Sequence, residues 1–233
     1  MAIVSCKNIS SISSVRTVSL KQWAQIHTFG KGKEYCELSK YIRSGNKKVS
    51  RKTCLFNFSS ATDCVSKKLG LCAADKFGCK CYAKKSENEM RKMVLPFRRR
   101  QELYWQKVTA EQFVSDFVFI NSLKGNPYTA LRFSEAGDFH NQKEVDKAEK
   151  IALLLNRFGI KVYCYSSRSD LSFKNCKHLI VSGSGFMKEG ISNIFQIIKN
   201  KKDKPNGYSL CKGNCRICNW CQIRGKKICV LAH

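Results

Sequence analysis

The fold is decided by residues 128–166, which read YTALRFSEAGDFHNQKEVDKAEKIALLLNRFGIKVYCYS. The first eleven are rich in strand-forming residues and end in a glycine turn. An amphipathic helix is predicted from about Gln142 to Arg157, with Asn141 or His140 as its N-cap. The apolar side of this helix carries Val145, Ala148, Ile151, Ala152 and Leu155. Residues 160–167 then form a second strand, and this order indicates a right-handed crossover between parallel strands.

The same alternation of strands and helices extends in both directions. Residues 178–185, HLIVSGSG, predict a third strand that runs into a glycine-rich turn, and residues 191–199, ISNIFQIIK, predict a helix. Upstream, Thr109 is expected to open a helix. We therefore expect a single α/β domain over residues 1–233, with a basic extension at 1–50. Its sheet is mainly parallel, either open or curved into a partial TIM-like barrel with the helices outside.

The composition is that of a globular protein, with 43% hydrophobic residues. No apolar run approaches the ~20 residues that a membrane span needs, and the first residues do not resemble a secretory signal. The 14 cysteines therefore favour metal ligands and free thiols over disulfides. We expect a cytoplasmic protein, in the host cytoplasm if a phage encodes it, with no membrane partner.

The net charge of +26 is unevenly distributed. It is +16 over residues 1–110, 0 over 111–170 and +10 over 171–233. This imbalance favours an anionic partner, with nucleic acid first and a host protein complex second. The alternative is a solvated surface that keeps the protein soluble. Arg98, Arg99 and Arg100 form the densest basic run outside the cysteine regions.

The sequence CKGNCRICNWC at residues 211–221 places four cysteines within eleven residues, Cys211, Cys215, Cys218 and Cys221. Neighbours this close form disulfides poorly, whereas thiolates can share one metal centre. The spacing C-x3-C-x2-C-x2-C is close to the bacterial iron–sulfur run, and its first part matches the triplet of radical S-adenosylmethionine (SAM) enzymes. Structural zinc more often uses two CxxC pairs. We predict an iron–sulfur cluster, [4Fe–4S] in type, with zinc as the alternative and SAM as a further cofactor.

The chain has two cysteine-rich regions. One spans residues 211–229 and contains the run described above, and the other spans residues 51–85. Within 51–85 we predict that Cys54, Cys79 and Cys81 bind metal, and we leave Cys64 and Cys72 open between ligand and bystander. We expect the two regions to meet near the sheet, where they share one centre or flank two.

Polar residues follow three of the predicted strands, where the carboxyl ends of a parallel sheet form ligand sites. The candidates for catalysis or substrate binding are Glu135, Asp138 and Arg168. Gly183 and Gly185 are candidates for cofactor binding, because a glycine turn can leave backbone amides free for an anion. The competing interpretation is that Asp138 caps a helix and that Arg168 pairs with Asp170. No nucleophile-elbow serine and no P-loop lysine is present.

Four segments, TCLFNF…GCKCYAKK, LRFSEAGDFHNQKEVDKAEKIA, VYCYSSRSDL and CRICNWC, resemble the phage gene product 88-like proteins from about Lys52 onward. That cysteine-rich family is similar in outline to radical SAM proteins. Leu55 stands where members have a proline, and the C-terminal position of the close cysteine triplet differs from radical SAM enzymes. The resemblance implies a cysteine-rich protein of a kind found in phages and some microbes, and it carries no activity over to this chain. Two functions remain open: a SAM-dependent or related iron–sulfur enzyme, or a non-catalytic protein stapled by a cluster or zinc that binds DNA, RNA or a host complex.

Overall fold

The computed structural model describes residues 36–232, so most of the basic extension lies outside the described part. An eight-stranded sheet has the order β1-β2-β3-β4-β5-β6-β8-β7. All neighbouring strands in it are parallel except β1 and β2. The strands are β1 (Arg43–Ser44), β2 (Thr53–Phe56), β3 (Ala130–Phe133), β4 (Lys161–Ser166), β5 (Ile180–Ser184), β6 (Asn193–Ile198), β7 (Ser209–Leu210) and β8 (Lys227–Leu231). The predicted α/β class and mainly parallel sheet are confirmed, and the pairing runs from edge to edge without closing.

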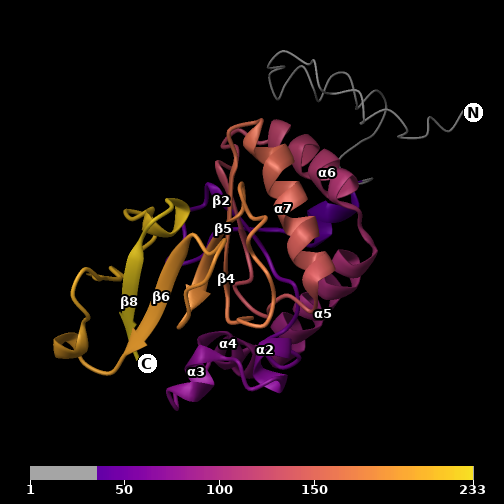
Figure 1. The fold of residues 1–233 in the computed structure, drawn as a ribbon. Helices are drawn as coiled ribbons and strands as arrows, with labels where there is room; N and C mark the ends of the chain where they lie inside the picture. The colour runs from indigo at the N-terminus through magenta and orange to yellow at the C-terminus, as the bar shows by residue number, and fades with distance from the viewer. Residues whose placement is uncertain (1–35, 233) are drawn as a thin grey trace, which may run out of the picture.

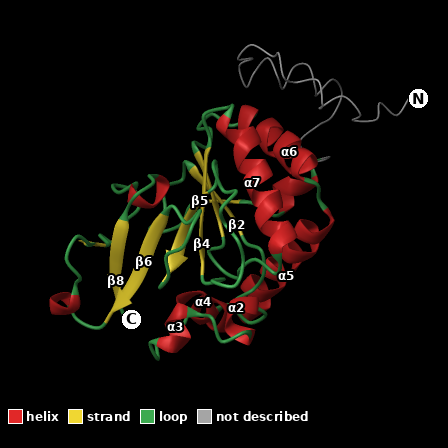
Figure 2. Ribbon diagram, viewed as in Figure 1, coloured by secondary structure: helices red, strands yellow, loops and turns green. Residues whose placement is uncertain are grey.

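Three longer helices form a layer on one side of the sheet, and three short ones lie together at one end of it, as Figures 1 and 2 show. The long helices are α5 (Arg91–Lys107), α6 (Ala110–Ser122) and α7 (Gln142–Asn156). The short helices are α2 (Val65–Lys68), α3 (Ala73–Lys76) and α4 (Tyr82–Glu89). Single 3₁₀ turns occur at η3 (Glu37–Lys40), η4 (Lys201–Asp203) and η5 (Trp220–Gln222). Among residues 36–232, no helix combines the length and the apolar character that a membrane span requires.

The segment that decided the sequence prediction folds as expected into β3, α7 and β4. The Asn141 side chain accepts a hydrogen bond from the Glu144 amide at 3.2 Å, which confirms Asn141 as the N-cap of α7. Thr109 caps α6 in the same way through the Gln112 amide at 3.1 Å. The predicted apolar side of α7 is buried from Val145 to Leu155.

The prediction of a helix over residues 191–199 is wrong, because these residues form β6. The strand pairs in parallel with β5 and β8. Its composition, with three isoleucines and a phenylalanine, suits a strand as well as a helix, and pairing on both sides decides between them.

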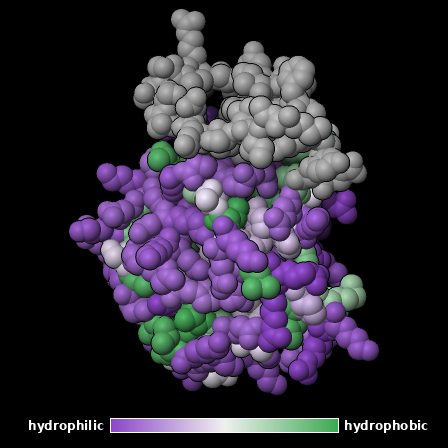
Figure 3. Space-filling model, turned by 90° about the vertical axis from the view of Figure 1, so that its right-hand side faces the viewer, coloured by the Kyte–Doolittle hydropathy of each residue, from purple (hydrophilic) through white to green (hydrophobic). Residues whose placement is uncertain are grey.

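The core fills the space between the sheet and the long helices with aromatic rings. The Phe56 ring lies 5.3 Å from Phe113 and 6.1 Å from Phe133, centroid to centroid, and Phe58 lies 4.7 Å from Trp105. Cys54 and Cys164 lie in this same core. Successive residues of a strand point to opposite faces of the sheet. On the face away from the long helices, Ala130, Tyr163 and Ile180 form a smaller cluster. The outer surface of the helical layer is mostly hydrophilic (Figure 3).

Candidate metal centre

The four C-terminal cysteines lie on the loop that leads from β7 to β8 and folds back over the second face of the sheet. The Cys211 amide donates to the Cys229 carbonyl at 2.7 Å, which fixes the start of the loop beside β8. Cys221 lies in η5 and packs against Ala130, Tyr163 and Ile180 on that face. Arg216 donates from Nη2 to the carbonyl of Asn46 at 3.2 Å. The loop is therefore held at both ends and at one point between them.

The sulfurs of this loop influence one another. Burial raises the pKa of Cys221 to about 11, the Tyr165 hydroxyl lowers it by donating to the sulfur, and Cys215 and Cys211 raise it further. Burial also raises the pKa of Cys215, and Cys211 and Cys218 add to that rise. These contributions couple Cys215 and Cys221 to the other cysteines of the loop, but among residues 36–232 no three His, Cys, Asp or Glu side chains are placed to hold a metal ion.

A guanidinium faces these thiols from the sheet. Arg132, on β3, stacks over the Tyr165 ring with its Cζ 4.9 Å from the centroid. Its charge lowers the pKa of both Cys215 and Cys221 against the larger effect of burial. Its buried Nε has no hydrogen-bond partner among residues 36–232. A cation so placed favours the thiolate form, which is the form that binds metals.

The N-terminal cysteine region is arranged differently from the prediction. Cys54 is fully buried in β2 among apolar side chains, and burial raises its pKa. Cys54 was predicted to bind metal, but it is a core residue whose sulfur is surrounded by apolar side chains. Cys79 follows the last turn of α3, and its sulfur donates to the Phe77 carbonyl at 3.6 Å. It therefore lies at the opposite end of that helix from Cys72.

Three other cysteines share one structural position, which we call the cysteine triad: Cys64, Cys72 and Cys81. Each is the residue immediately before a short helix, and their ψ angles are 120°, 119° and 119°. Burial raises the pKa of Cys64 to about 12, with Cys72 contributing to the rise. Burial raises the pKa of Cys72 as well, with a contribution from Cys81. Cys72 is thus coupled electrostatically to both Cys64 and Cys81, although in the described part of the chain the three thiols are not placed to hold a single metal ion.

A sequence repeat marks two members of the triad and could have revealed them. Residues 64–70 read CVSKKLG and residues 72–78 read CAADKFG, which share the pattern C-x3-K-apolar-G. Gly70 and Gly78 both have φ of +66°, a conformation that glycine adopts without strain. Each repeat is therefore one helical turn that begins at a cysteine and ends at a glycine.

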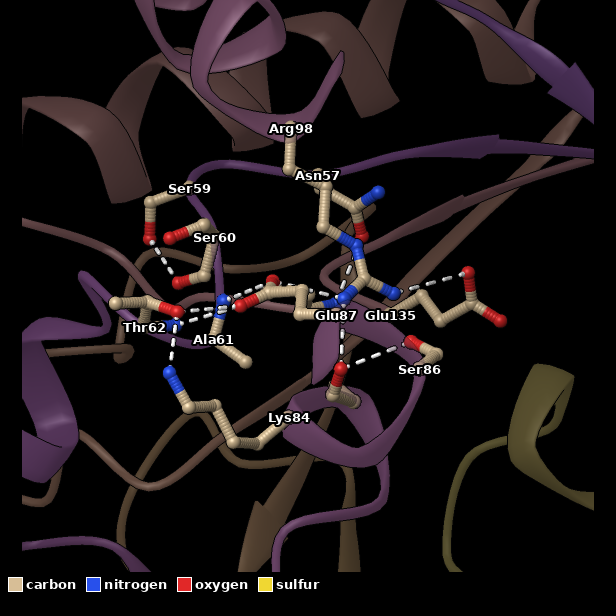
Figure 4. Close-up of polar contacts among 12 residues, drawn as sticks. Asn57, Ser59, Ser60, Ala61, Thr62, Lys84, Ser86, Glu87, Arg98 and Glu135 are labelled. Atoms are coloured by element: carbon tan, nitrogen blue, oxygen red, sulfur yellow. Dashed lines mark hydrogen bonds and ion pairs between the residues drawn. The ribbon is translucent and has the colours of Figure 1, made fainter. Parts of the chain in front are cut away.

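A buried ion pair holds the triad segment in place, as Figure 4 shows. The Glu87 carboxylate accepts from the amides of Ala61 and Thr62 at 2.6 and 2.9 Å and from Arg98 Nη1 at 2.9 Å. Burial opposes ionisation of Glu87, but the hydrogen bonds from Arg98, the Ala61 amide and the Thr62 hydroxyl outweigh it and lower the pKa of this carboxyl. This network fastens α4 and α5 to the chain just before Cys64.

Asp138, a predicted catalytic residue, is buried and accepts four hydrogen bonds within the protein. Its carboxylate accepts from Ser66 Oγ at 2.7 Å, Ser166 Oγ at 2.8 Å, and the amides of Ser167 and Phe139 at 2.8 and 2.9 Å. Burial raises its pKa, and these hydrogen bonds act in the opposite direction. Asp138 thereby ties α2 to the carboxyl ends of β3 and β4.

The other two predicted catalytic residues are also engaged within the protein. Arg168 donates to both carboxylate oxygens of Asp170, at 2.8 and 2.7 Å, and to the Phe139 carbonyl. Glu135 accepts from the side chain of Asn46 at 2.6 Å, and its carbonyl accepts from the Tyr82 hydroxyl at 2.7 Å. These contacts position loops at the sheet edge.

The glycine turn does not offer the free amides that we expected. The Gly185 amide donates to the Phe195 carbonyl at 2.9 Å. Gly183 lies within β5, where a Cβ would come within 2.3 Å of the Phe186 carbonyl oxygen, so the turn requires glycine for close backbone approach. Gly185 does line a cavity of about 70 Å³, together with Ala73, Ser167, Ser169 and Ser184.

No family model, curated protein or solved structure matches this chain. The resemblance to the gene product 88-like proteins therefore stays a prediction, and the function is argued from the residues themselves.

Proposed function

We propose that the protein binds an iron–sulfur cluster through Cys211, Cys215, Cys218 and Cys221. The observation that supports this proposal most is the position of the loop. Cys221 packs against Tyr163 on the second face of the sheet and accepts a hydrogen bond from Tyr165, and the charge of Arg132 acts on both Cys215 and Cys221. Four thiolates complete the ligand set of a [4Fe–4S] cluster.

In this position the cluster would have a mainly structural role, because it would hold the C-terminal loop against the sheet. The loop joins β7 and β8, the last two strands in the chain, and η5 contacts β4 and β5 in the middle of the sheet. A centre closed by four cysteines leaves no iron for a substrate. Of the two functions left open by the sequence, the structural role suits this loop better, with zinc as the alternative metal.

The test compares metal content in two single variants purified without oxygen. Cys218→Ser should lose most of the iron and acid-labile sulfide that this loop holds. Cys79→Ser, a matched thiol outside the loop, should retain wild-type content. Equal iron content in both variants would reject the assignment. If the wild-type protein instead contains stoichiometric zinc, and only Cys218→Ser loses it, the four cysteines bind zinc and not a cluster.

We also propose that the basic surface binds nucleic acid, but through different residues from those the sequence suggested. Arg98 is buried and paired with Glu87, and Arg99 donates to Asp63 at 2.8 Å, so two members of the arginine run are engaged. An exposed alternative surrounds η4, at Lys199, Lys201, Lys202 and Lys204. Lysines of this kind contact phosphates without reading sequence.

A gel-shift titration at low salt with duplex DNA, single-stranded DNA and RNA tests this second proposal. Affinity should fall with salt, with a slope of about −0.9 per contacted phosphate on duplex DNA. Neutralising Lys201 and Lys202 to glutamine should weaken binding and reduce that slope. The control neutralises the exposed Lys143 and Lys161, which removes the same charge elsewhere. Absence of binding, or equal loss in both variants, would leave an acidic host protein as the partner for the charge.

A further inference from the structure

The cysteine triad lies at the end of the sheet where ligands bind in parallel α/β folds. Three hydrogen bonds hold α2, α3 and α4 at this end of the sheet, one from the first turn of each helix. Ser66 on α2 donates to Asp138, and the amide of Ala73 on α3 donates to Ser167 Oγ at 3.4 Å. Tyr82 on α4 donates to the carbonyl of Glu135. Figures 1 and 2 show α2, α3 and α4 grouped at that end.

Two side chains near the triad that could supply a fourth ligand, Asp138 and Cys79, are engaged elsewhere. Each oxygen of the Asp138 carboxylate already accepts two hydrogen bonds. Cys79 is directed to the carbonyl of Phe77 at the far end of α3. The C-terminal cysteines lie on a separate loop, over the second face of the sheet.

We propose that Cys64, Cys72 and Cys81 hold a second iron–sulfur cluster, in which one iron is left for a small ligand with an oxygen or nitrogen donor. Cysteine thiolates are the usual ligands of such clusters. The three thiols would each lose a proton on binding. A cluster of several irons and sulfides is larger than a single ion, and so it holds its cysteines farther apart than zinc does. This site uses none of the residues of the C-terminal centre and goes beyond the function proposed for it.

A place for the small ligand adjoins the triad. The cavity of about 70 Å³ is lined by Leu71 and Ala73, the two chain neighbours of Cys72, and by the hydroxyl side chains of Ser167, Ser169 and Ser184. Phe77 and Phe186 form its apolar part, and no triad cysteine lines it directly. Lys76 also lines it and supplies a positive charge. Hydroxyls and an ammonium suit a small polar or anionic molecule. The open iron and this cavity would together form the reactive part of the protein.

Alkylation of the wild-type protein tests the site without any change to the fold. The protein is purified without oxygen, treated with iodoacetamide, and analysed by mass spectrometry before and after the cluster is destroyed with ferricyanide and EDTA. Cys64, Cys72 and Cys81 should be protected at first and labelled afterwards, whereas Cys79 should be labelled in both states. Labelling of the triad before cluster removal would overturn the proposal, whatever happens at Cys211 to Cys221.

Two variants then separate this centre from the C-terminal one. Cys72→Ser should lose about half of the iron and sulfide, and Cys218→Ser should lose the other half. In Cys218→Ser, cyanide should shift the EPR spectrum of the reduced protein, because only the triad cluster has an iron that it can reach. An unchanged spectrum would contradict an open iron, and unchanged iron in Cys72→Ser would contradict the site. Zinc in place of iron at the triad would also reject it.

Discussion

Arg132 donates from Nη2 to the hydroxyl of Tyr82 at 3.2 Å, and this contact joins the two cysteine regions of the protein. Tyr82 directly follows Cys81 of the triad, while the charge of Arg132 also acts on Cys215 and Cys221. One guanidinium on β3 therefore lies within reach of both groups of thiols. The two regions approach each other without sharing residues.

Replacing Arg132 by methionine should make the C-terminal centre more sensitive to acid. The guanidinium lowers the pKa of Cys215 and Cys221, so its loss raises both values and protons compete better with the metal. The pH at which half of the iron is released should therefore move upward. Arg132→Lys keeps the charge and should shift this pH less. A metal-release titration with equal midpoints in wild type and Arg132→Met would refute the electrostatic role.

Replacing Tyr165 by phenylalanine should slow alkylation of Cys221 in the metal-free protein. Burial raises the pKa of this thiol, and the hydrogen bond from Tyr165 lowers it, so removing the hydroxyl raises the pKa further. Less thiolate is then present at pH 8, and the reaction slows. Tyr208→Phe, at a hydroxyl beyond β6, should leave the rate unchanged. A faster reaction at Cys221 in the first variant would mean that the ring shields the sulfur more than its hydroxyl activates it.

Replacing Glu87 by glutamine should destabilise the fold by about 3 kcal/mol, because the buried charge of Arg98 loses its closer carboxylate and keeps only Glu135 at 3.9 Å. The matched control is Glu89→Gln, two residues along the same helix. Glu89 pairs with Lys85 at 3.8 Å on the exposed surface, and its loss should change the free energy of unfolding by less than about 0.5 kcal/mol. Urea unfolding followed by circular dichroism measures both. Equal changes in unfolding free energy would show that the buried pair stabilises the fold no more than the exposed one.

The same carboxylate predicts a dependence of stability on acid. The fold lowers the pKa of Glu87 from its ordinary value of 4.5. Its contribution is therefore complete above pH 4.5 and is lost as the pH falls through the lower folded value. The difference in unfolding free energy between wild type and Glu87→Gln should shrink below pH 4.5. A difference that stays constant down to pH 2 would contradict this linkage.

His140 predicts the opposite dependence. Its Nε2 lies 3.0 Å from Glu102 on α5 and its Nδ1 lies 3.2 Å from Glu144 on α7, so the imidazolium clamps two helices. The hydrogen bond to Glu144 raises its pKa above 6.5. This stability is complete below pH 6.5 and is lost as the pH rises through the folded pKa. Relative to His140→Gln, wild type should lose its advantage in alkaline solution, and unfolding curves between pH 5 and 9 would detect it.

The parts of the fold with strong local signals could be predicted from the sequence. The caps at Thr109 and Asn141 and the apolar side of α7 are local patterns, and they appear as expected. Residues 193–198 could not be assigned in this way, because a run of isoleucines fits either element and the neighbouring strands decide. The side of a strand that faces the core is also a tertiary property, so Cys54 could not be recognised as a core residue.

The candidate site was predicted least well where residues are brought together by contacts distant in sequence. The spacing of Cys211 to Cys221 is visible in the sequence, whereas the triad depends on three short helices fastened to Asp138, Ser167 and Glu135. Asp138 illustrates the limit, since an aspartate after a strand can act on a substrate or hold loops together. Its four hydrogen bonds favour the second role here.

A Mössbauer spectrum decides whether this protein binds an iron–sulfur cluster. Protein purified without oxygen from cells grown on enriched iron should show the quadrupole doublets of cluster iron, with acid-labile sulfide equal to iron. A colourless protein without cluster iron, whether metal-free or loaded with zinc, would contradict the proposal.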